Sequence, residues 1–394
     1  MVSIWCEEAA RELLRQCVAG EPWNADLALS LGQPECADAL FRILIEGLAD
    51  RFERRLCDDY VAIFSLILER ALPGLRAEEL IARYGRIRAR GWQAKGLPHR
   101  VAVLSRVTLG ADIAITSVLL DAAQRRFPNA EIWFAGSAKA AELFAGFPWV
   151  KHLDAPYVRG SIQQRLEAWR HLAQQFRDDD WLVIDPDSRL TQLGLLPIVD
   201  EERYLFFESR AYGEKSSDSL STLAKRWAKE TLGVENALGL IAPPLIEPPV
   251  TGPFATVSLG TADNTAKQMP PAFEAELMRE ICAHFPNVIV DRGFGADEAA
   301  RVEKAIAGTG AITWSGSFAS FASLIAASSC YVGYDSAGQH AAAAFGTPAI
   351  TLFKGFVNER MFARWQPAVR SVVIREGDIT IETVRAALAS FSRL

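Results

Sequence analysis

The residues best suited to bind an anionic ligand lie near the C-terminus. An apolar run at 331–334 leads into a polar turn, and a helix of small residues is expected to start near Gln339. Backbone amides at a helix N-terminus, beside a hydroxyl and a glycine, favour a phosphate group. His340 could donate to a phosphate or a ribose, or it could be a satisfied core histidine. The segment predicts an anion site formed by Asp335, Ser336, Gly338, Gln339 and His340.

A second candidate loop spans residues 258–267 and follows an expected strand at 255–259. It contains Ser258, a glycine turn at Gly260, Thr261 and the ammonium group of Lys267. A diphosphate leaving group needs hydrogen-bond donors and positive charge where negative charge builds. A plain surface loop could have the same composition, and the spacing is not that of a P-loop.

Asp112 is the carboxylate that follows the first expected strand, at 101–104. Gly110 permits a tight turn before it, and helical spacing starts directly after it. Two interpretations stay open. The carboxylate could cap the helix by accepting from its free amides. It could instead act as a base at a cleft, provided that part of it stays free, because capping lowers a carboxylate pKa.

These residues require strands to position them, and strands alternate with helices from Arg100 onward. Strand, helix, strand within about thirty residues is typical of a parallel βαβ unit. Ligands of such sheets bind outside the carboxyl ends of the strands, where all the candidates lie. The expected strands are 101–104, 131–134 and 181–184, then 255–259, 288–290, 331–333 and 349–353.

The chain divides at a proline-rich stretch, residues 239–253, which excludes a helix and stiffens an extended connector. Before Arg100 the apolar spacing is helical throughout. We therefore predict an α/β protein with an all-α N-terminal domain at 1–97, called here the helical region. We also predict two Rossmann-like domains that face each other across a cleft. They are residues 98–245, called here the first half, and residues 246–394, called here the second half.

The composition limits the classes of partner. A net charge of −6 and a pI near 5.6 argue against a nucleic-acid partner, which needs a basic face. The N-terminus carries charges where a secretory signal needs apolar residues, and no transmembrane segment is expected, so the sequence predicts a cytoplasmic protein.

Six cysteines without a C-x-x-C pair predict reduced thiols and no metal site. The basic stretch at 83–100 is either a solvated helix face or a surface for an anionic acceptor.

Together, the motifs resemble those of the heptosyltransferase family of inverting glycosyltransferases, over residues 100–367 and weakly between 156 and 252. Thr108-Leu-Gly-Ala-Asp112-Ile is similar to the family's S-L-G-D-[VI], with Ala111 inserted. Residues 335–340 and 346–348 are similar to D-[ST]-G-x-x-H and G-x-P. The sequence departs from the family at Ala337 and Met269, which replace a glycine and a tryptophan, and at 354–356, which replaces G-P-T.

The resemblance implies GT-B architecture and direct displacement of a nucleotide diphosphate at the anomeric carbon of a sugar, of which a heptose is one candidate. Asp112 would be the general base, and the two loops of the second half would hold the nucleotide-sugar donor without a metal or cofactor. The first half, with the helical region, would bind a glycan, lipid-linked or protein acceptor, with Asp185, Asp187 and Arg189 near the cleft. Two other functions stay open: a nucleotide-sugar epimerase or hydrolase, and a non-catalytic nucleotide-sugar-binding protein.

Overall fold

The computed structural model describes residues 4–89, 91–92, 96–178, 180–261, 264–368 and 370–391. The helical region is confirmed as all-α within the described residues. Its longest helix, α4, buries an apolar stripe that includes Tyr60, Phe64 and Leu68. The elements are α1 (Ile4–Ala19), α2 (Ala25–Leu31), η1 (Pro34–Cys36), η2 (Ala39–Ile45), α3 (Glu46–Ala49), α4 (Arg54–Ala71) and α5 (Ala77–Ala89).

A disulfide joins α1 to η1, between Cys6 and Cys36, with their Cα atoms 5.3 Å apart. The prediction that all cysteines are reduced is wrong for this pair. Thirty residues separate the two in sequence, and they meet because α1 packs against η1 and η2. The remaining cysteines, Cys17, Cys57, Cys282 and Cys330, are free thiols.

The first half contains a parallel sheet in the order β3-β2-β1-β4-β5. Alternate residues of β1 face opposite sides of the sheet. Ala102 and Leu104 join the core shared with the helical region and α9, whereas Val101 and Val103 pack with α7 and α10. The helical region therefore covers one face of this sheet. The strands are β1 (Arg100–Leu104), β2 (Glu131–Gly136), β3 (Val150–Asp154), β4 (Trp181–Asp185) and β5 (Tyr204–Phe206).

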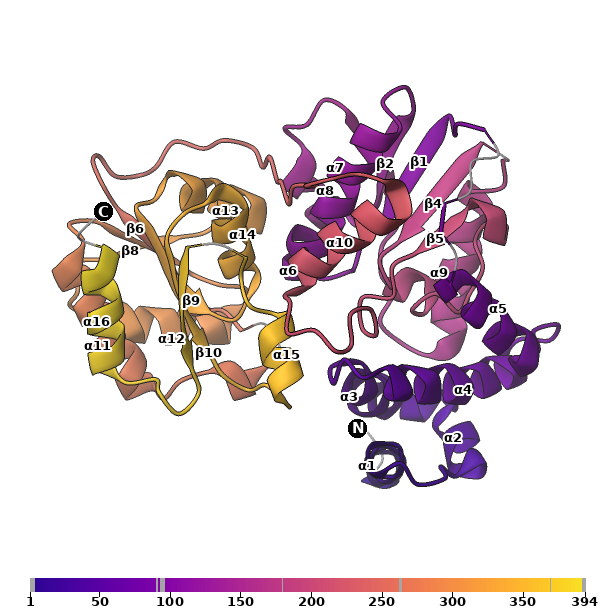
Figure 1. The fold of residues 1–394 in the computed structure, drawn as a ribbon. Coiled ribbons are helices and arrows are strands. Elements are labelled where there is room, and N and C mark those ends of the chain that lie inside the picture. The colour runs from indigo at the N-terminus through magenta and orange to yellow at the C-terminus, as the bar shows by residue number, and fades with distance from the viewer. Residues whose placement is uncertain are drawn as a thin grey trace.

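The helices of the first half follow the strands at their carboxyl ends and return over the two faces of the sheet (Figure 1). They are α6 (Leu109–Ala111), η3 (Asp112–Thr116), α7 (Ser117–Arg126), α8 (Ala138–Ala141), η4 (Glu142–Phe144), α9 (Ile162–Gln175), η5 (Arg189–Thr191), η6 (Glu201–Arg203) and α10 (Leu220–Leu232).

The second half contains a parallel sheet in the order β11-β10-β9-β6-β7-β8. Helices α11, α12 and α16 pack on one face, and α13 and α14 on the other. The strands are β6 (Ala255–Ser258), β7 (Val288–Asp291), β8 (Ile312–Trp314), β9 (Cys330–Tyr334), β10 (Ala349–Phe353) and β11 (Ser371–Arg375). The helices are η7 (Thr265–Lys267), α11 (Pro271–His284), α12 (Ala296–Ile306), α13 (Phe318–Ala327), α14 (Ala337–Phe345), α15 (Glu359–Arg364) and α16 (Ile381–Phe391).

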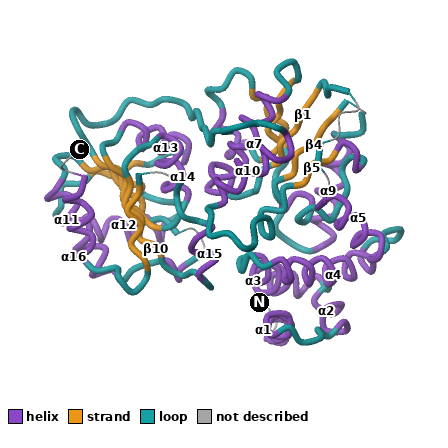
Figure 2. The backbone as a smooth tube through the Cα atoms, viewed as in Figure 1, coloured by secondary structure: helices purple, strands orange, loops and turns teal. Residues whose placement is uncertain are grey.

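Figure 2 shows the two sheets as separate layers, each between helices, and the extended connector that joins the halves. The predicted fold class is confirmed: two doubly wound parallel sheets preceded by a helical region. The division at 97/98 and 245/246 stays a prediction. Across the described residues, no helix is both long enough and apolar enough to span a membrane.

The turn between α3 and α4 ties the helical region to the second half. Asn358 Nδ2 donates to the Arg51 carbonyl at 3.2 Å, and Arg360 Nη1 donates to the Phe52 carbonyl at 2.8 Å. The Phe52 ring packs edge-on against Trp365, with centroids 6.3 Å apart. Since the helical region also packs on the first sheet, it contacts both halves of the molecule.

Candidate functional site

The centre of the candidate site is the start of α14, at the carboxyl end of β9. The helix begins at Ala337, two residues before the predicted start, because Ser336 occupies the N-cap with extended backbone angles. The Ser336 side chain does not bond to the helix amides. The amides of the first turn of α14 are therefore not satisfied by a side-chain cap, and a ligand could accept hydrogen bonds from them.

Lys267 and Asp335 form a close ion pair at this helix start. Lys267 Nζ lies 2.6 Å from Asp335 Oδ2 and 3.0 Å from the Asp335 carbonyl oxygen. Gln339 is fully buried and donates from Nε2 to Asp335 Oδ1 and, at 3.1 Å, to the Trp365 carbonyl. The structure thus brings together Lys267, Asp335 and Gln339, which lie in two predicted loops.

His340 lies beside this network in the first turn of α14. Burial lowers the pKa of its imidazole to about 4, against the opposing effect of Asp335. Its ring packs against Trp365, with centroids 5.8 Å apart. At neutral pH the imidazole is therefore uncharged, so His340 can serve as a hydrogen-bond partner but not as a cation.

Gly338 is required by packing. A Cβ atom built on Gly338 would lie 2.1 Å from the hydroxyl oxygen of Tyr331, a fully buried side chain of β9. Because any side chain at this position would displace the tyrosine, the glycine fixes how closely α14 approaches the sheet.

Ser258 ends β6, Gly260 and Thr261 follow it, and their side-chain hydrogen bonds reach other residues of the second half. Ser258 Oγ donates to Asp291 Oδ2 at 3.3 Å and accepts from the Gly260 amide at 3.4 Å. Thr261 Oγ1 accepts from Gln268 Nε2 at 3.1 Å. Within the described part of the chain, no hydrogen bond joins these three residues to Lys267 or Asp335. Their assignment to a donor site stays a prediction.

Asp112 is fully buried, and both of its carboxylate oxygens are engaged. Oδ2 accepts from Ser105 Oγ at 2.7 Å, and Oδ1 accepts from the Arg106 amide at 2.6 Å and from Thr116 Oγ1 at 2.8 Å. Burial raises the pKa of this carboxyl to about 6 despite these bonds. The capping interpretation is wrong, because the helix begins at Leu109 and Thr108 is its N-cap.

The bonds of Asp112 hold a strained turn after β1. Val107 has a φ of 78°, a conformation that a β-branched residue rarely adopts, and its amide donates to Ser105 Oγ at 2.8 Å. The helix after this turn contains a π-helical segment, η3, directly after Ala111. A π-helical turn accommodates one extra residue, in agreement with an insertion at Ala111 relative to the family motif.

The start of α6 faces the start of α14 across the two halves. A Cβ atom on Gly110 would lie 3.2 Å from His340 Cδ2 and 3.4 Å from the Cα atom of Ala337. The turn after β1 and the turn after β9, Asp335 and Ser336, therefore meet, as expected for one site formed by the carboxyl ends of two sheets.

The acidic pair at the carboxyl end of β4, Asp185 and Asp187, has structural partners. Asp185 is fully buried and accepts from the Ser188 amide at 2.6 Å, from Thr191 Oγ1 and from the Tyr204 hydroxyl. Burial raises the pKa of this carboxyl to about 6. Asp187 Oδ2 lies 2.6 Å from Arg210 Nη1 and 3.8 Å from Arg106 Nη1.

Two buried arginines of this cluster, Arg106 and Arg210, are absent from the sequence-based site. Arg106 Nη1 donates to the Asp187 carbonyl at 2.5 Å, and its buried Nε has no partner within the described residues. Burial, with repulsion from Arg210, lowers the pKa of the Arg106 guanidinium to about 9. Arg189 binds Glu46 of the helical region, with Nη1 2.8 Å from Oε1.

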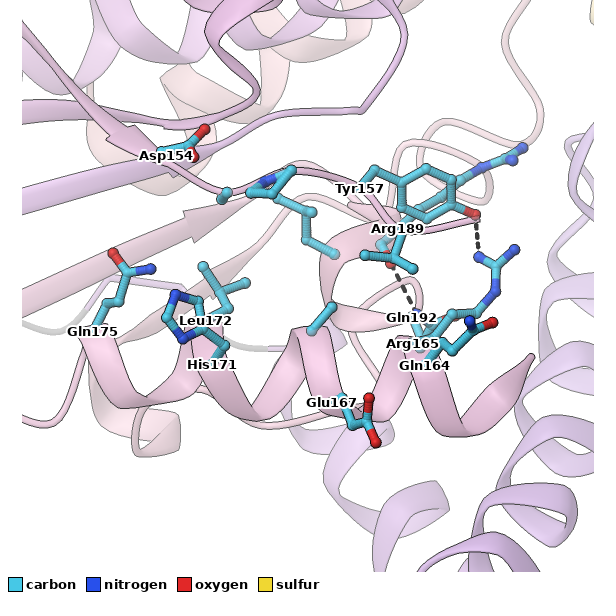
Figure 3. Close-up of a pocket in the computed structure, with 15 residues that line it drawn as sticks. Asp154, Tyr157, Gln164, Arg165, Glu167, His171, Leu172, Gln175, Arg189 and Gln192 are labelled. Atoms are coloured by element: carbon cyan, nitrogen blue, oxygen red, sulfur yellow. Dashed lines mark hydrogen bonds between the residues drawn. The ribbon is translucent and has the colours of Figure 1, made fainter. Parts of the chain in front are cut away.

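A cavity of about 410 Å³ lies beside this cluster, between α9 and the turns that follow β3 and β4 (Figure 3). Leu172, Leu190 and Pro156 give it an apolar wall, and His171, Glu167 and Gln175 contribute polar groups. Arg165 donates to the Tyr157 hydroxyl at one end, and Gln192 Nε2 donates to the Arg189 carbonyl at 3.1 Å. The sequence did not predict this cavity, because α9 and the 189–192 turn meet only in the fold.

Among the residues that the structure describes, no group of three or more His, Cys, Asp or Glu side chains is arranged to hold a metal ion. Lys267 and the first amides of α14 supply positive charge at the turn after β9.

Two doubly wound parallel sheets meet at their carboxyl ends, with Lys267 and the N-terminus of α14 at the junction, which is the arrangement of the GT-B fold. The family model of glycosyltransferase family 9 (heptosyltransferase) matches residues 172–380, and the chain belongs to this family. The resemblance found in the sequence is thereby confirmed. A search of curated proteins found no match.

Solved structures of similar fold include Escherichia coli heptosyltransferase WaaC with ADP, at 15% identity and a TM-score of 0.56, covering 74% of this chain and 99% of that one. A glycosyl transferase family 9 protein from Veillonella parvula DSM 2008 is 13% identical, with a TM-score of 0.58 and coverages of 74% and 97%. E. coli ADP-heptose lps heptosyltransferase II is 18% identical, with a TM-score of 0.53 and coverages of 74% and 98%.

Proposed function

We propose that this chain transfers a sugar from a nucleotide-diphosphate donor to a hydroxyl acceptor, with inversion at the anomeric carbon. The observation that carries the proposal is the pairing of Lys267 with Asp335 at the uncapped start of α14, directly opposite the turn after β1. A phosphate placed there would meet a lysine and free helix amides from one half and the acceptor from the other.

For the donor, Lys267, Ser336 and the first amides of α14 would bind the diphosphate, with Gln339 and Asp335 holding the lysine in place. A lysine and a helix N-terminus stabilise charge that develops on a leaving diphosphate without a metal ion. We therefore propose that transfer is metal-independent and continues in excess chelator. Ser258, Gly260, Thr261 and His340 complete the proposed donor site.

For the acceptor, the cavity beside α9 supports binding to the first half. It has the size of a small-molecule pocket, with an apolar wall and polar groups at its edge. Arg189, at one end of it, also binds the helical region through Glu46. A glycan with an apolar portion would match this lining.

The resemblance assigns proton abstraction from the acceptor to Asp112, whose pKa of about 6 suits a base at neutral pH. In the structure, its oxygens already accept three hydrogen bonds. Asp112 can take up a substrate proton only if the turn after β1 releases one of them.

The test is to incubate the protein with ADP-, GDP-, UDP- and dTDP-sugars, with and without a panel of glycan and lipid-linked acceptors, and to measure products by mass spectrometry. Ligands that resemble those of similar folds come first, because WaaC was solved with ADP. An acceptor-dependent product supports transfer. Conversion of the donor alone supports an epimerase or hydrolase, and donor binding without turnover supports a non-catalytic role.

A further inference from the structure

Phe52, in the turn between α3 and α4, reaches the second half of the molecule from the helical region. Its ring is buried, and its backbone φ of 55° lies in the left-handed region, which a bulky residue rarely adopts. Such a conformation persists only where the surrounding structure holds it. The contacts that hold Phe52 lead from the helical region to the candidate site.

Both halves of the molecule hold this turn. From the second half, Arg360 Nη1 of α15 donates to the Phe52 carbonyl at 2.8 Å. From the first half, Glu214 Oε1 accepts from the Arg54 amide at 3.3 Å. Figure 1 shows the end of α3 close to α15. The turn is thus fixed where the three parts of the molecule meet.

Trp365, directly after α15, connects Phe52 to the candidate site. The Phe52 ring packs edge-on against the Trp365 ring, with centroids 6.3 Å apart, and the His340 ring lies 5.8 Å from the same tryptophan. The Trp365 carbonyl accepts a hydrogen bond from Gln339 Nε2 at 3.1 Å. Trp365 is therefore in contact both with Phe52 and with two residues of the first turn of α14.

The amide of Gln339 links Trp365 to the lysine of the proposed donor site. Gln339 is fully buried, and its Nε2 donates to two acceptors, the Trp365 carbonyl and Asp335 Oδ1. Asp335 in turn holds Lys267, whose Nζ lies 2.6 Å from Oδ2. A buried amide nitrogen needs both acceptors to satisfy its two hydrogens, so a shift of Trp365 would displace Gln339. The pair of Asp335 with Lys267 would then move as well.

We propose that Phe52 is a positioning residue of the nucleotide-sugar site, which acts by fixing Trp365 and does not contact the donor. The inference rests on the function proposed above. Phe52, Gln339 and His340 are buried, and closely packed groups transmit a displacement from one to the next. The helical region is then necessary for tight binding of the donor, although residues of the second half hold the diphosphate.

The test measures the affinity of the wild type, Phe52→Leu, Trp365→Leu and the double variant for ADP, GDP, UDP and dTDP by calorimetric titration. Phe64→Leu is the matched control, because Phe64 is a buried aromatic residue of α4 whose ring contacts Phe41 and Tyr60 of the helical region. Urea unfolding gives the stability that each variant loses, so that affinities are compared among folded proteins.

We expect Phe52→Leu to bind the nucleotide that the wild type binds at least about fivefold more weakly. Phe64→Leu should bind it within about twofold of the wild type, although both variants lose stability. In the double variant, Phe52→Leu should add less than about twofold to the effect of Trp365→Leu, because substitutions that act through one contact are not additive. Trp365→Phe, which retains an aromatic ring, should recover most of the affinity.

Arg360→Met provides a second measurement, which is decisive if Phe52→Leu does not fold. It removes the hydrogen bond to the Phe52 carbonyl and leaves the buried ring in place. We expect it to weaken nucleotide binding by about threefold. Arg385→Met, in an exposed pair with Glu280 of the second half, is its control and should bind the nucleotide as the wild type does.

Three results would overturn the role of Phe52. The first is an affinity within about twofold of the wild type in Phe52→Leu, or unchanged affinity in Arg360→Met where Phe52→Leu does not fold. The second is an equal loss of affinity in Phe64→Leu, which makes the effect one of stability. The third is a fully additive loss in the double variant, which excludes action through Trp365. A wild type that binds none of these nucleotides contradicts the proposed function itself, a result distinct from all three.

Discussion

Gly110 of the first half and His340 of the second half are in contact, so closely that a Cβ atom on Gly110 would lie 3.2 Å from the histidine ring. Each residue stands at the start of a helix that follows a central strand of its own sheet. The contact shows that the two motifs found in the sequence, more than two hundred residues apart, form one junction.

A larger side chain at Gly110 should push this junction apart. We expect Gly110→Leu to weaken ADP binding at least about tenfold, or about 1.4 kcal/mol, in calorimetric titrations, because a leucine side chain at this position cannot fit against His340 and Ala337. Gly85→Leu is the matched control, since a Cβ atom on that helical glycine of α5 meets no atom within 4 Å. Equal ADP affinity in both variants would show that the junction does not shape the nucleotide site.

Asp112→Asn should destabilise the protein as well as affect catalysis. The amide replaces an acceptor oxygen with a donor, facing the Arg106 amide and the hydroxyls of Ser105 and Thr116. Leaving buried groups unpaired costs about 1–3 kcal/mol, measurable by urea unfolding. Asp38→Asn, in an exposed pair with Arg42, should cost less than about 1 kcal/mol. An unchanged unfolding free energy for Asp112→Asn would contradict the structural role of this carboxylate.

The buried imidazole of His340 should make stability depend on acidity. Its pKa is about 4 in the folded chain, below its ordinary value of about 6.5, so the unfolded chain binds the extra proton first as the pH falls. The contribution of His340 to the free energy of unfolding is complete above about pH 6.5. It is lost on acidification toward pH 4, by on the order of 1 kcal/mol per pH unit. Thermal unfolding of His340→Gln should show a flatter pH profile in this window. A profile parallel to that of the wild type contradicts the shift.

The disulfide should stabilise the helical region. It closes a loop with a sequence separation of 30 residues, which corresponds to about 3.6 kcal/mol in the chain-entropy estimate. Adding dithiothreitol or replacing Cys6 with serine should lower the melting temperature of the protein. A variant in which the free Cys282 is replaced with serine is the control, and dithiothreitol should lower its melting temperature as much as that of the wild type. Mass spectrometry after alkylation gives the number of free thiols. Alkylation of Cys6 and Cys36 in the oxidised protein would rule out the bond.

The sequence predicted the central strands of both sheets but not their edges. The four strands that were missed, β3, β5, β8 and β11, are the outermost ones of their sheets. Central strands are buried on both faces and form continuous apolar runs, whereas edge strands mix exposed and buried residues. In β3, Lys151, His152 and Asp154 are exposed, and this obscures the pattern. The alternation of strands and helices, the proline-rich connector and the family motif could be predicted from the sequence, because each depends on local residue types.

The sequence predicted residues of the candidate site only where they belong to a local motif. Lys267 and Asp335 were each identified from their loops, and the fold places them 2.6 Å apart. Asp112 was identified as a carboxylate after β1, but the sequence did not predict its burial or the strained turn at Val107, because local spacing does not encode them. Arg106 and Arg210 were not identified, because they reach Asp187 through packing between segments distant in sequence.

Calorimetric titration with ADP-, GDP-, UDP- and dTDP-sugars would show whether the start of α14 is a nucleotide-sugar site. The wild type, Lys267→Ala and a control, Lys304→Ala on α12, are compared. We expect one nucleotide sugar to bind the wild type and the control equally, and to bind Lys267→Ala at least about tenfold more weakly. Binding that is unaffected by Lys267→Ala, or no binding of any nucleotide sugar to the wild type, would contradict it.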